Sequence, residues 1–443
     1  MSSNNPFGGF DFEQLRKMLE QLGFGDAENL NLEDLVAQVS KLQNSGVMFG
    51  MTNADRDPDA AWRTTLTAAK QLAAESGADP ALTTDERTAV VDAERLAQSW
   101  LSAVTGFPET GRPARAVTRA GWLDETGEGW RRTIEPIIEG LADALERGTA
   151  PDQDDVPELQ GMTQMFAPML RQSASMIYRD RLKRELAQVA GDILTGTELG
   201  INLLSGSDVL LLPANVAQFT RDLDANDSDV VLYLLLREAA RQRLFHSVGW
   251  LSPQLGAMVA HFAREITIDF DAIAEQFNPE ALSGLSIEDV MAVGESVRGS
   301  FFRPTRTATQ VEILERLQVL LALVEGWVDH VVAQATAQWM PNAPQLEEII
   351  HRRRASGTAV TSVFTELLGL DLHPRLVRDA KNLWAALLHH RGAEGRDAVW
   401  GHPDLLPTAA QLADPLPFAA GQAAEADGPE DDLDAELRKL LGG

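Results

Sequence analysis

Hydrophobic residues recur at helical spacing along most of the chain. The segment Leu232–Phe245, LYLLLREAARQRLF, has leucines before a charged centre and apolar residues after it, which is the layout of a buried helix. Long apolar faces also run through Val311–Gln338 and Arg375–Arg391. Strand patterns are rare: Ser205–Phe219 holds the best candidate, and Pro213 within it indicates a sheet edge or the end of the strand. The pattern therefore predicts a mainly α fold with few short strands.

Glycine and proline refine this pattern in three places. Gly127 and Gly129 interrupt the predicted helix Trp122–Leu145, because glycine is a poor helix former. Gly326 has another meaning, since a helix that lacks a side chain at one position can pack closely against its neighbour. The proline-rich stretch Pro403–Ala420 is predicted to be irregular.

The chain divides into three parts by composition. Residues 1–58 form a flexible N-terminal segment with one short amphipathic helix, Phe10–Phe24, which docks either on the body of the protein or on a partner. Residues 59–420 carry the helical pattern and are expected to form one domain. Residues 421–443 form an acidic C-terminal tail. A functional site is therefore expected in the body.

Composition excludes several classes of function. The 38 basic and 66 acidic residues give a formal net charge of -28, which disfavours binding to nucleic acid and to anionic membranes. The chain has no cysteine, so disulfides, thiolate zinc sites and cysteine nucleophiles are ruled out. It shows neither a secretory signal nor an apolar stretch of the ~20 residues that cross a bilayer. We therefore expect an acidic, cytoplasmic protein.

The charged centre of the segment at 232–245 has the spacing of a hydrolytic site. A helix turns once every ~3.6 residues, so Arg237 and Arg241 share one face, with Glu238 beside them. In zinc proteases with the motif H-E-x-x-H, two histidines at these positions bind zinc and the glutamate acts as general base. This chain keeps the glutamate but has arginine at both histidine positions. Glu238 is therefore a vestigial candidate for the general base.

Zinc proteases with a glutamate ligand take it from a later helix, and Glu325 in LVEGWVDHVV is the best candidate. Asp329 and His330 lie about one turn further on, so this segment has the composition of half a metal site. The alternative is that Glu325 is a buried carboxylate paired with arginine, because buried charges need partners. A site made from His246, Glu265 and His330 is a further alternative, although no ligand spacing supports it.

Physical chemistry favours the paired carboxylate. A guanidinium cannot lose its proton to become a metal ligand, and Arg237 and Arg241 would place theirs where the metal belongs. They can instead neutralise Glu238 and Glu325 through charge-assisted, bidentate hydrogen bonds. We hypothesise that an Arg–Glu cluster replaces the metal and holds two helices together.

The sequence contains no motif that supports another type of catalysis or nucleotide binding. No histidine pair has the H-x-x-x-H spacing, no G-x-S-x-G elbow supports a serine triad, and no P-loop or dinucleotide fingerprint occurs. The one dense basic run is His351–Arg354. It is interpreted either as a solvated helix end, where cations suit the helix dipole, or as a contact for an acidic partner or phosphate.

Six stretches have an order and spacing typical of one family. They are Ala93–Leu101, Gly161–Gln172, Leu194–Leu203, Leu235–Phe245, Leu323–Val332 and Arg396–Pro407. Together they resemble the zincin-like metallopeptidase and hydrolase family of actinobacteria, some members of which are associated with the biosynthesis of a deazaflavin coenzyme. The resemblance covers most of the chain and implies a zincin-like, mostly helical domain.

The resemblance also implies roles for individual positions. In metal-competent relatives the motif helix resembles H-E-x-x-H, which corresponds here to Arg237, Glu238 and Arg241. The later segment resembles E-G-H, which corresponds to Glu325 and Trp327 at its first and third positions. Arginine at both histidine positions makes this chain a degenerate member of the family.

Two functions follow from these observations. The first is a pseudoenzyme: a metallopeptidase homologue without zinc peptidase activity or cofactor, which acts as a binding or scaffolding protein for an unknown protein partner or peptide. The alternative is an active metal-dependent hydrolase or peptidase with a non-standard site that uses Glu238 and Glu325, with zinc held by Glu325 and His330.

Overall fold

A computed structural model describes residues 57–148, 175–176, 178–221, 223–267, 306–368 and 374–421. The predicted N-terminal helix Phe10–Phe24, the acidic tail and the stretch Gly161–Gln172 lie outside the described residues. The described residues cover most of the body predicted at 59–420.

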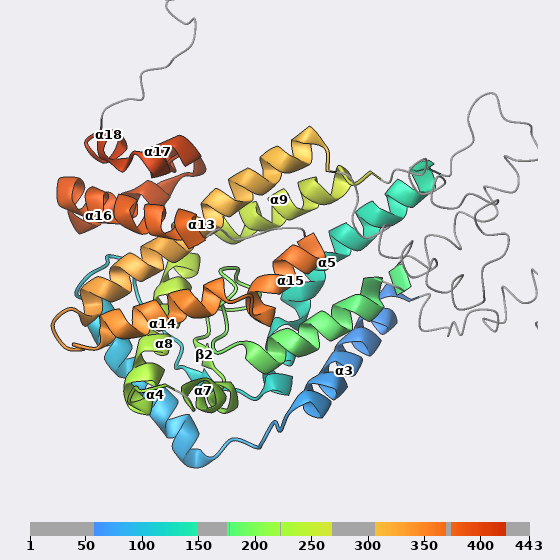
Figure 1. The fold of residues 1–443 in the computed structure, drawn as a ribbon, viewed down its shortest axis with the longest axis horizontal. Helices are drawn as coiled ribbons and strands as arrows, with labels where there is room; N and C mark the ends of the chain where they lie inside the picture. Colours follow the sequence, from blue (N-terminus) through green and yellow to red (C-terminus); the bar gives the residue numbers. More distant parts are fainter. Residues whose placement is uncertain are drawn as a thin grey trace, which may run out of the picture.

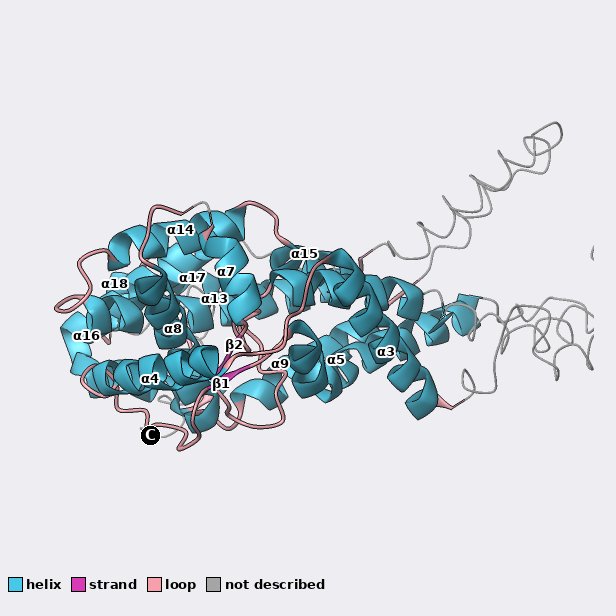
Figure 2. Ribbon diagram, turned by 90° about the horizontal axis from the view of Figure 1, so that it is seen from below, coloured by secondary structure: helices cyan, strands magenta, loops and turns pink. Residues whose placement is uncertain are grey.

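The described residues fold into a helical assembly with two short strands (Figures 1 and 2). The longer helices are α3 (Pro58–Ser76), α4 (Thr84–Leu101), α5 (Arg119–Gly148), α8 (Asp227–Ser247), α9 (Leu251–Arg264), α13 (Ala308–Thr336), α14 (Ala343–Ala355) and α16 (Pro374–Asp397). The shorter ones are α7 (Pro213–Thr220), α15 (Ala359–Leu368), η4 (Ala398–Gly401), η5 (Pro403–Leu405), α17 (Ala409–Ala413) and α18 (Pro415–Ala419). Figure 2 shows α3 and α5 at one end of an elongated body and α4, α14 and α16 toward the other. The predicted mainly α class is confirmed.

Helix α8 carries the motif segment and lies inside the assembly. Asn226 caps its first turn by accepting a hydrogen bond from Ser228 N at 2.8 Å. Asp227 and Asp229 in that turn suit the positive end of the helix dipole. Every residue from Leu232 to Phe245 is buried, the charged ones included, and α4, α13 and α14 pack around the helix. The predicted buried helix is confirmed, and its charged side chains need partners in the interior.

Helix α13 is the second buried helix and packs against α16, α8 and α9. It begins with a capping box, in which Thr307 and Gln310 each accept a hydrogen bond from the other's backbone N–H. Gly326 lets α16 approach closely: a Cβ there would lie 2.6 Å from Ala380 Cβ and 2.7 Å from Lys381 N. Figure 1 shows α13 and α16 next to each other. The close packing predicted at Gly326 is confirmed.

The small sheet joins distant parts of the chain. β1 (Arg115–Ala116) and β2 (Leu210–Leu211) pair in parallel, and Thr195 adds an antiparallel bridge to β2. The strand predicted within Ser205–Phe219 is therefore present but only two residues long. Pro213 begins α7, because the first turn of a helix has no internal partner for the N–H that proline lacks.

Two predictions about glycine and proline are wrong. Helix α5 runs without a break through Gly127 and Gly129, although both were expected to interrupt it. A Cβ at Gly129 would lie 1.9 Å from the Leu203 carbonyl oxygen, so close packing explains this glycine better than helix breaking. The stretch at 403–420 is not irregular but holds η5, α17 and α18, and prolines stand in the first turns of η5 and α18.

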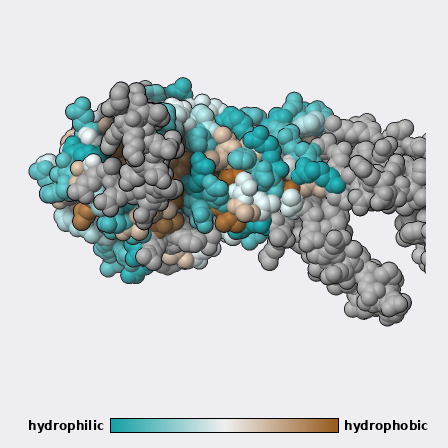
Figure 3. Space-filling model, turned by 90° about the horizontal axis from the view of Figure 1, so that it is seen from above, coloured by the Kyte–Doolittle hydropathy of each residue, from teal (hydrophilic) through white to brown (hydrophobic). Residues whose placement is uncertain are grey.

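The surface that the structure describes is largely hydrophilic, as Figure 3 shows for one face. The apolar residues are collected in one core that runs through the long helices. The exposed large hydrophobic residues are scattered along the chain: Leu96, Val311, Trp339, Leu405 and Leu416. None of the described helices is both long enough and apolar enough to cross a membrane.

Gly326→Ala should destabilise the protein, because a methyl group has no room between α13 and α16. We expect a loss of about 1–3 kcal/mol, the usual cost of forcing extra atoms into a packed core. Gly256→Ala is the matched control, since Gly256 is exposed in α9 and a Cβ there meets nothing within 4 Å. That variant should be stabilised by about 0.5–1 kcal/mol. Urea unfolding measures both effects, and equal stability of the two variants would contradict the close contact.

Candidate functional site

Three helices bring charged residues together at the centre of the assembly. Helix α8 supplies Arg237 and Arg241, one turn apart on one face, as the motif spacing predicts. Helix α13 supplies Glu325 and, one turn later, Asp329. Helix α14 adds Arg354 from its last turn, a residue that sequence analysis did not place here. We call these five residues the Arg–carboxylate cluster.

Glu325 is the centre of the Arg–carboxylate cluster and binds all three arginines. Arg241 holds it with a two-pronged contact, in which Nε donates to Oε1 at 2.6 Å and Nη2 donates to Oε2 at 3.1 Å. Arg237 Nη2 donates to Oε2 at 3.2 Å, and Arg354 Nη2 donates to the same oxygen. Because Glu325, Arg237 and Arg241 are buried, these charge-assisted bonds form away from water. The contact predicted between these two arginines of α8 and Glu325 is present.

Asp329 links two of these arginines, Arg237 and Arg354, to a histidine. Arg237 Nη1 lies 2.5 Å from Asp329 Oδ1, so one guanidinium bridges two carboxylates that are one helical turn apart. Arg354 Nη1 lies 3.9 Å from the same oxygen, and His351 Nε2 lies 2.9 Å from Asp329 Oδ2. Cations from α8 and α14 therefore neutralise two carboxylates on α13, which ties three helices together.

The arginines decide the charge state of both carboxyl groups. Burial by itself would raise each pKa, because it removes the water that stabilises the charged form. For Glu325 the guanidiniums outweigh burial, with Arg241 contributing most and Arg354 next, and they lower the pKa to about 2. Arg237 likewise outweighs burial at Asp329 and holds its pKa well below the usual range. Both groups are therefore negatively charged at neutral pH.

Glu238 is held mainly by residues outside the Arg–carboxylate cluster. Its Oε2 accepts hydrogen bonds from Thr197 N at 3.0 Å and Thr197 Oγ1 at 2.8 Å, and its Oε1 accepts one from Gln242 Nε2 at 3.3 Å. Arg241 Nη1 is more distant, at 3.6 Å. Burial is complete and raises the pKa of Glu238, which Arg241 and Thr197 offset only in part. Arg241 thus contacts Glu238 as predicted, but Thr197 is the residue that fixes its carboxyl group.

Trp327 does not join the Arg–carboxylate cluster. Two residues along a helix are rotated by about 200° from each other, so Trp327 and Glu325 leave α13 on different faces. Trp327 Nε1 donates to Asp397 Oδ1 at 3.0 Å, and its ring centre lies 5.5 Å from that of Phe107. This tryptophan is a core residue on the far side of the helix.

The side chains at the two histidine positions do not fit a zinc ion. A guanidinium offers no lone pair to a metal, and the candidate third ligand, Glu325, is already bound by three guanidiniums. His330 does not replace them, because its charged neighbours are Arg396, Lys381 and Asp397. Burial, with the two cations, lowers the pKa of His330 to about 4. No reaction step through zinc can be derived from this arrangement.

One group of metal-ligating side chains escaped sequence analysis. Asp329, Glu347 and His351 have ligand atoms within 4.8 Å of one another, and no other such group of three occurs among the described residues. The signal in the sequence is the i, i+4 spacing of Glu347 and His351 on α14. Two cations already neutralise this group, since Lys381 pairs with Glu347 and Arg237 pairs with Asp329.

The alternative site from three other residues does not form within the described part of the chain. His246, Glu265 and His330 are not brought together as a group of ligands. His246 instead lies at the end of α8, where its Nδ1 is 3.2 Å from Ser207 Oγ.

The basic run at 351–354 forms the last turn of α14, which confirms its interpretation as a helix end. The expectation that this end is solvated is wrong for His351, which pairs with Asp329 at 2.9 Å, and for two of the arginines. Arg353 turns inward to Asp192, at 3.0 Å, and Arg354 turns inward to Glu325. Arg353 thus pairs with a partly exposed carboxylate and Arg354 with a buried one, and the buried carboxylate is the one that needs a cation.

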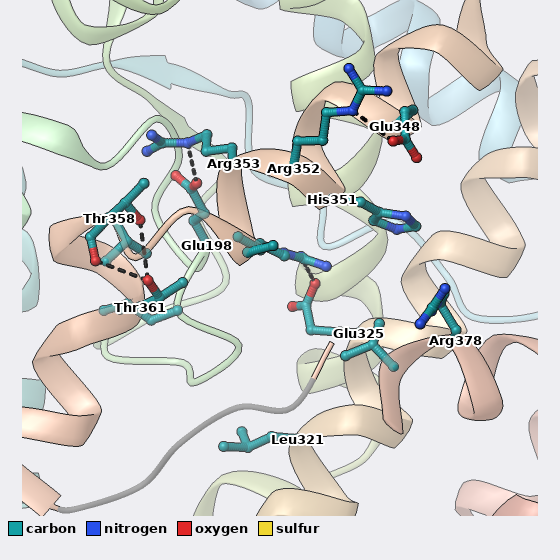
Figure 4. Close-up of a pocket in the computed structure, with 15 residues that line it drawn as sticks. Glu198, Leu321, Glu325, Glu348, His351, Arg352, Arg353, Thr358, Thr361 and Arg378 are labelled. Atoms are coloured by element: carbon teal, nitrogen blue, oxygen red, sulfur yellow. Dashed lines mark hydrogen bonds and ion pairs between the residues drawn. The ribbon is translucent and has the colours of Figure 1, made fainter. Parts of the chain in front are cut away.

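A cavity of about 310 Å³ lies beside Glu325 (Figure 4). Helices α13, α14, α15 and α16 and a loop that precedes β2 form its walls. Figure 4 shows Glu325 near the middle of the view, with Thr361 to one side and Arg378 to the other. Glu238 does not line this cavity, and neither do the two arginines of α8. The candidate general base therefore does not face this cavity.

Comparison with known proteins agrees with the fold. A family model described as zincin-like metallopeptidase matches residues 61–419. The chain belongs to this zincin-like metallopeptidase family. A crystal structure from Chloroflexus aurantiacus, described as a "putative hydrolase with a novel fold", matches with 19% identity and a TM-score of 0.54. The match covers 83% of this chain and 99% of that one, and at this identity it concerns the fold alone. No curated protein sequence matches the chain.

Arg241→Ala should destabilise this zincin-like protein by about 3 kcal/mol or more, because it removes the two-pronged partner of a buried carboxylate. Arg352→Ala is the control: Arg352 lies on α14 and is exposed, and its surface pair with Glu348 contributes less than about 1 kcal/mol. Thermal unfolding of both variants measures the difference. An unchanged melting temperature in Arg241→Ala would rule out a structural role for the Arg–carboxylate cluster.

Low pH should lower the free energy of unfolding of this zincin-like protein, because Glu325 becomes protonated. Its pKa falls from 4.5 to about 2 on folding, so its contribution is present above about pH 4.5 and is lost as the pH falls toward 2. At about 1.4 kcal/mol per pKa unit the loss is about 3 kcal/mol, and Asp329 adds to it with the same sign.

The comparison with Arg354→Ala isolates this effect. Without Arg354 the folded-state pKa of Glu325 moves back toward 4.5, so the variant should lose less stability between pH 6 and pH 3 than the wild type. The raised pKa of Glu238 acts in the opposite direction, but it is common to both proteins and cancels. Urea unfolding at several pH values gives both curves, and parallel curves would contradict the assignment.

Proposed function

We propose that this zincin-like protein has no zinc peptidase activity and acts as a binding or scaffolding protein. The observation that carries the proposal is the position of Glu238: its carboxyl is fully buried, bound by Thr197 and separated from the cavity. A general base has to reach the proton that it removes. Glu238 in this position reaches neither a water molecule nor a peptide in the cavity.

The Arg–carboxylate cluster supports the same proposal. In a zinc protease the metal supplies the positive charge that the third-ligand carboxylate needs. Here Arg237, Arg241 and Arg354 supply it, so the carboxylate of Glu325 is stable without a metal. The interior is thus built for stability in the absence of zinc, and we expect no cofactor.

The cavity and the charge of the protein indicate the kind of partner. The cavity lies at the end of α14, so a small group of a protein partner or peptide has a place to bind. A formal net charge of -28 argues against nucleic acid, because a phosphate backbone requires a basic surface. We therefore propose that the partner is a protein or a peptide.

The second candidate function is a metal-dependent hydrolase with a non-standard site. The observation that favours it is the group formed by Asp329, Glu347 and His351, whose ligand atoms lie close enough for one ion. A metal there has to displace Lys381 from Glu347 and Arg237 from Asp329. This requirement makes the hydrolase the weaker candidate.

Metal content tests the proposal directly. Purified protein that has been incubated with zinc and desalted should retain far less than one zinc per chain by elemental mass spectrometry. Glu347→Gln serves as the matched variant, because it removes a ligand from the second candidate site and leaves Glu325 in place. Near-stoichiometric zinc that disappears in Glu347→Gln would overturn the proposal in favour of the hydrolase.

Glu238→Gln supplies a second readout. Any residual peptide hydrolysis by the preparation should be the same in this variant as in the wild type, because Glu238 does not line the cavity. The amide keeps the size of the side chain and an acceptor for Thr197, so the fold should be retained. Peptidase activity that is present in the wild type and lost in Glu238→Gln would contradict the proposal and favour a hydrolase that uses Glu238.

A further inference from the structure

The arginines that line the cavity beside Glu325 outnumber the carboxylates that line it. Three carboxylates and four guanidiniums line it. Each carboxylate has an arginine partner: Glu348 binds Arg352 at 2.7 Å, Glu198 binds Arg353 at 3.3 Å, and Glu325 binds Arg354. Arg378 has no carboxylate partner of this kind: it makes no hydrogen bond or ion pair within the part of the chain that the structure describes. An unbalanced cation at a cavity attracts an anion, most of all in a protein that is otherwise strongly acidic.

A second guanidinium in the lining has an unused donor. Arg354 Nη2 binds Glu325, but its Nη1 is buried without a hydrogen-bond acceptor, and its ion-pair partner Asp329 Oδ1 is 3.9 Å away. Arg354 and Arg378 line the same cavity, so both guanidiniums contribute positive charge near an anion bound there.

The rest of the lining is largely apolar. Aliphatic side chains form much of the remaining wall: Leu199, Leu321, Val360 and Val377. The hydroxyl group of Thr361 is already used, because it donates to the Thr358 carbonyl oxygen at 2.9 Å. Such walls favour an aliphatic group over a phosphate or a sugar, which need several polar partners.

The volume limits the size of the ligand. The cavity of about 310 Å³ is at the small end of the usual range for ligand pockets, which is about 300–1,000 Å³. A ligand about the size of one aliphatic amino-acid residue suits such a cavity.

We propose that this cavity binds the carboxylate of a small, branched aliphatic acid. Arg378 binds the carboxylate, the positive charge of Arg354 assists it, and the aliphatic wall surrounds the hydrocarbon part. A guanidinium suits this role because its two parallel N–H groups match the two oxygens of a carboxylate. The C-terminal residue of a peptide and a free branched-chain acid share this chemistry. The inference rests on the proposed function, since it names the ligand class of the same non-catalytic cleft.

Isothermal titration calorimetry of the full-length protein with N-acetyl-leucine tests the ligand class. N-acetyl-leucinamide should bind at least tenfold more weakly, because it lacks the charge that Arg378 pairs with. N-acetylglycine should also bind about tenfold more weakly, because it lacks the side chain that the aliphatic wall surrounds. A tetrapeptide ending in leucine then identifies the source: binding as tight as that of N-acetyl-leucine indicates a peptide C-terminus, and weaker binding indicates a free acid.

Two variants with the same change of charge test the assignment to Arg378. Arg378→Ala should weaken the binding of N-acetyl-leucine at least tenfold, and it should fold normally because Arg378 is exposed. Arg316→Ala removes an exposed charge from α13 outside the cavity and should change the affinity by less than about twofold. Equal effects of the two variants, equal affinity for the acid and the amide, or no binding at millimolar ligand would each overturn the inference.

The zinc measurement separates this inference from the function on which it rests. A protein that binds neither zinc nor N-acetyl-leucine would overturn the ligand class alone. A protein that holds stoichiometric zinc would overturn the proposed loss of the metal site, whatever its affinity for the acid.

Discussion

The negative charge of Glu325 is the constraint on which the centre of this structure depends. A carboxylate in the interior costs several kcal/mol unless cations and hydrogen bonds replace its water. Arginines from α8 and α14 meet this need, and two of them, Arg237 and Arg354, also pair with a second carboxylate, Asp329. These ion pairs join α8, α13 and α14. Ion pairs therefore hold the interior of this zincin-like protein together at the positions of the motif.

Most of the fold could be predicted because the buried helices have strong apolar patterns. The segment at 232–245 has apolar residues on every side of its charged centre, which only a buried helix accommodates. Local propensity was a poor guide where tertiary packing overrides it. Gly129 stays helical because its missing side chain makes room for the Leu203 carbonyl oxygen, a partner about seventy residues away that no local pattern reveals.

The candidate site could be predicted only as far as spacing along one helix determines it. Arg237 and Arg241 share a face, and the need of a buried carboxylate for cations brings them to Glu325. Arg354 could not be found in this way, because its position depends on how α14 returns across α13. Trp327 shows a related limit: correspondence to a family motif does not determine the direction in which the side chain points.

The sharing of one carboxylate by Arg237 and Arg241 has an evolutionary consequence. A single arginine-to-histidine change at either position would supply one metal ligand while the other arginine still occupies Glu325. That first step would weaken the ion pairs and would not yet hold a metal, so selection would oppose it. A metal site built on these two positions would therefore need both to change together, because each arginine by itself still occupies Glu325.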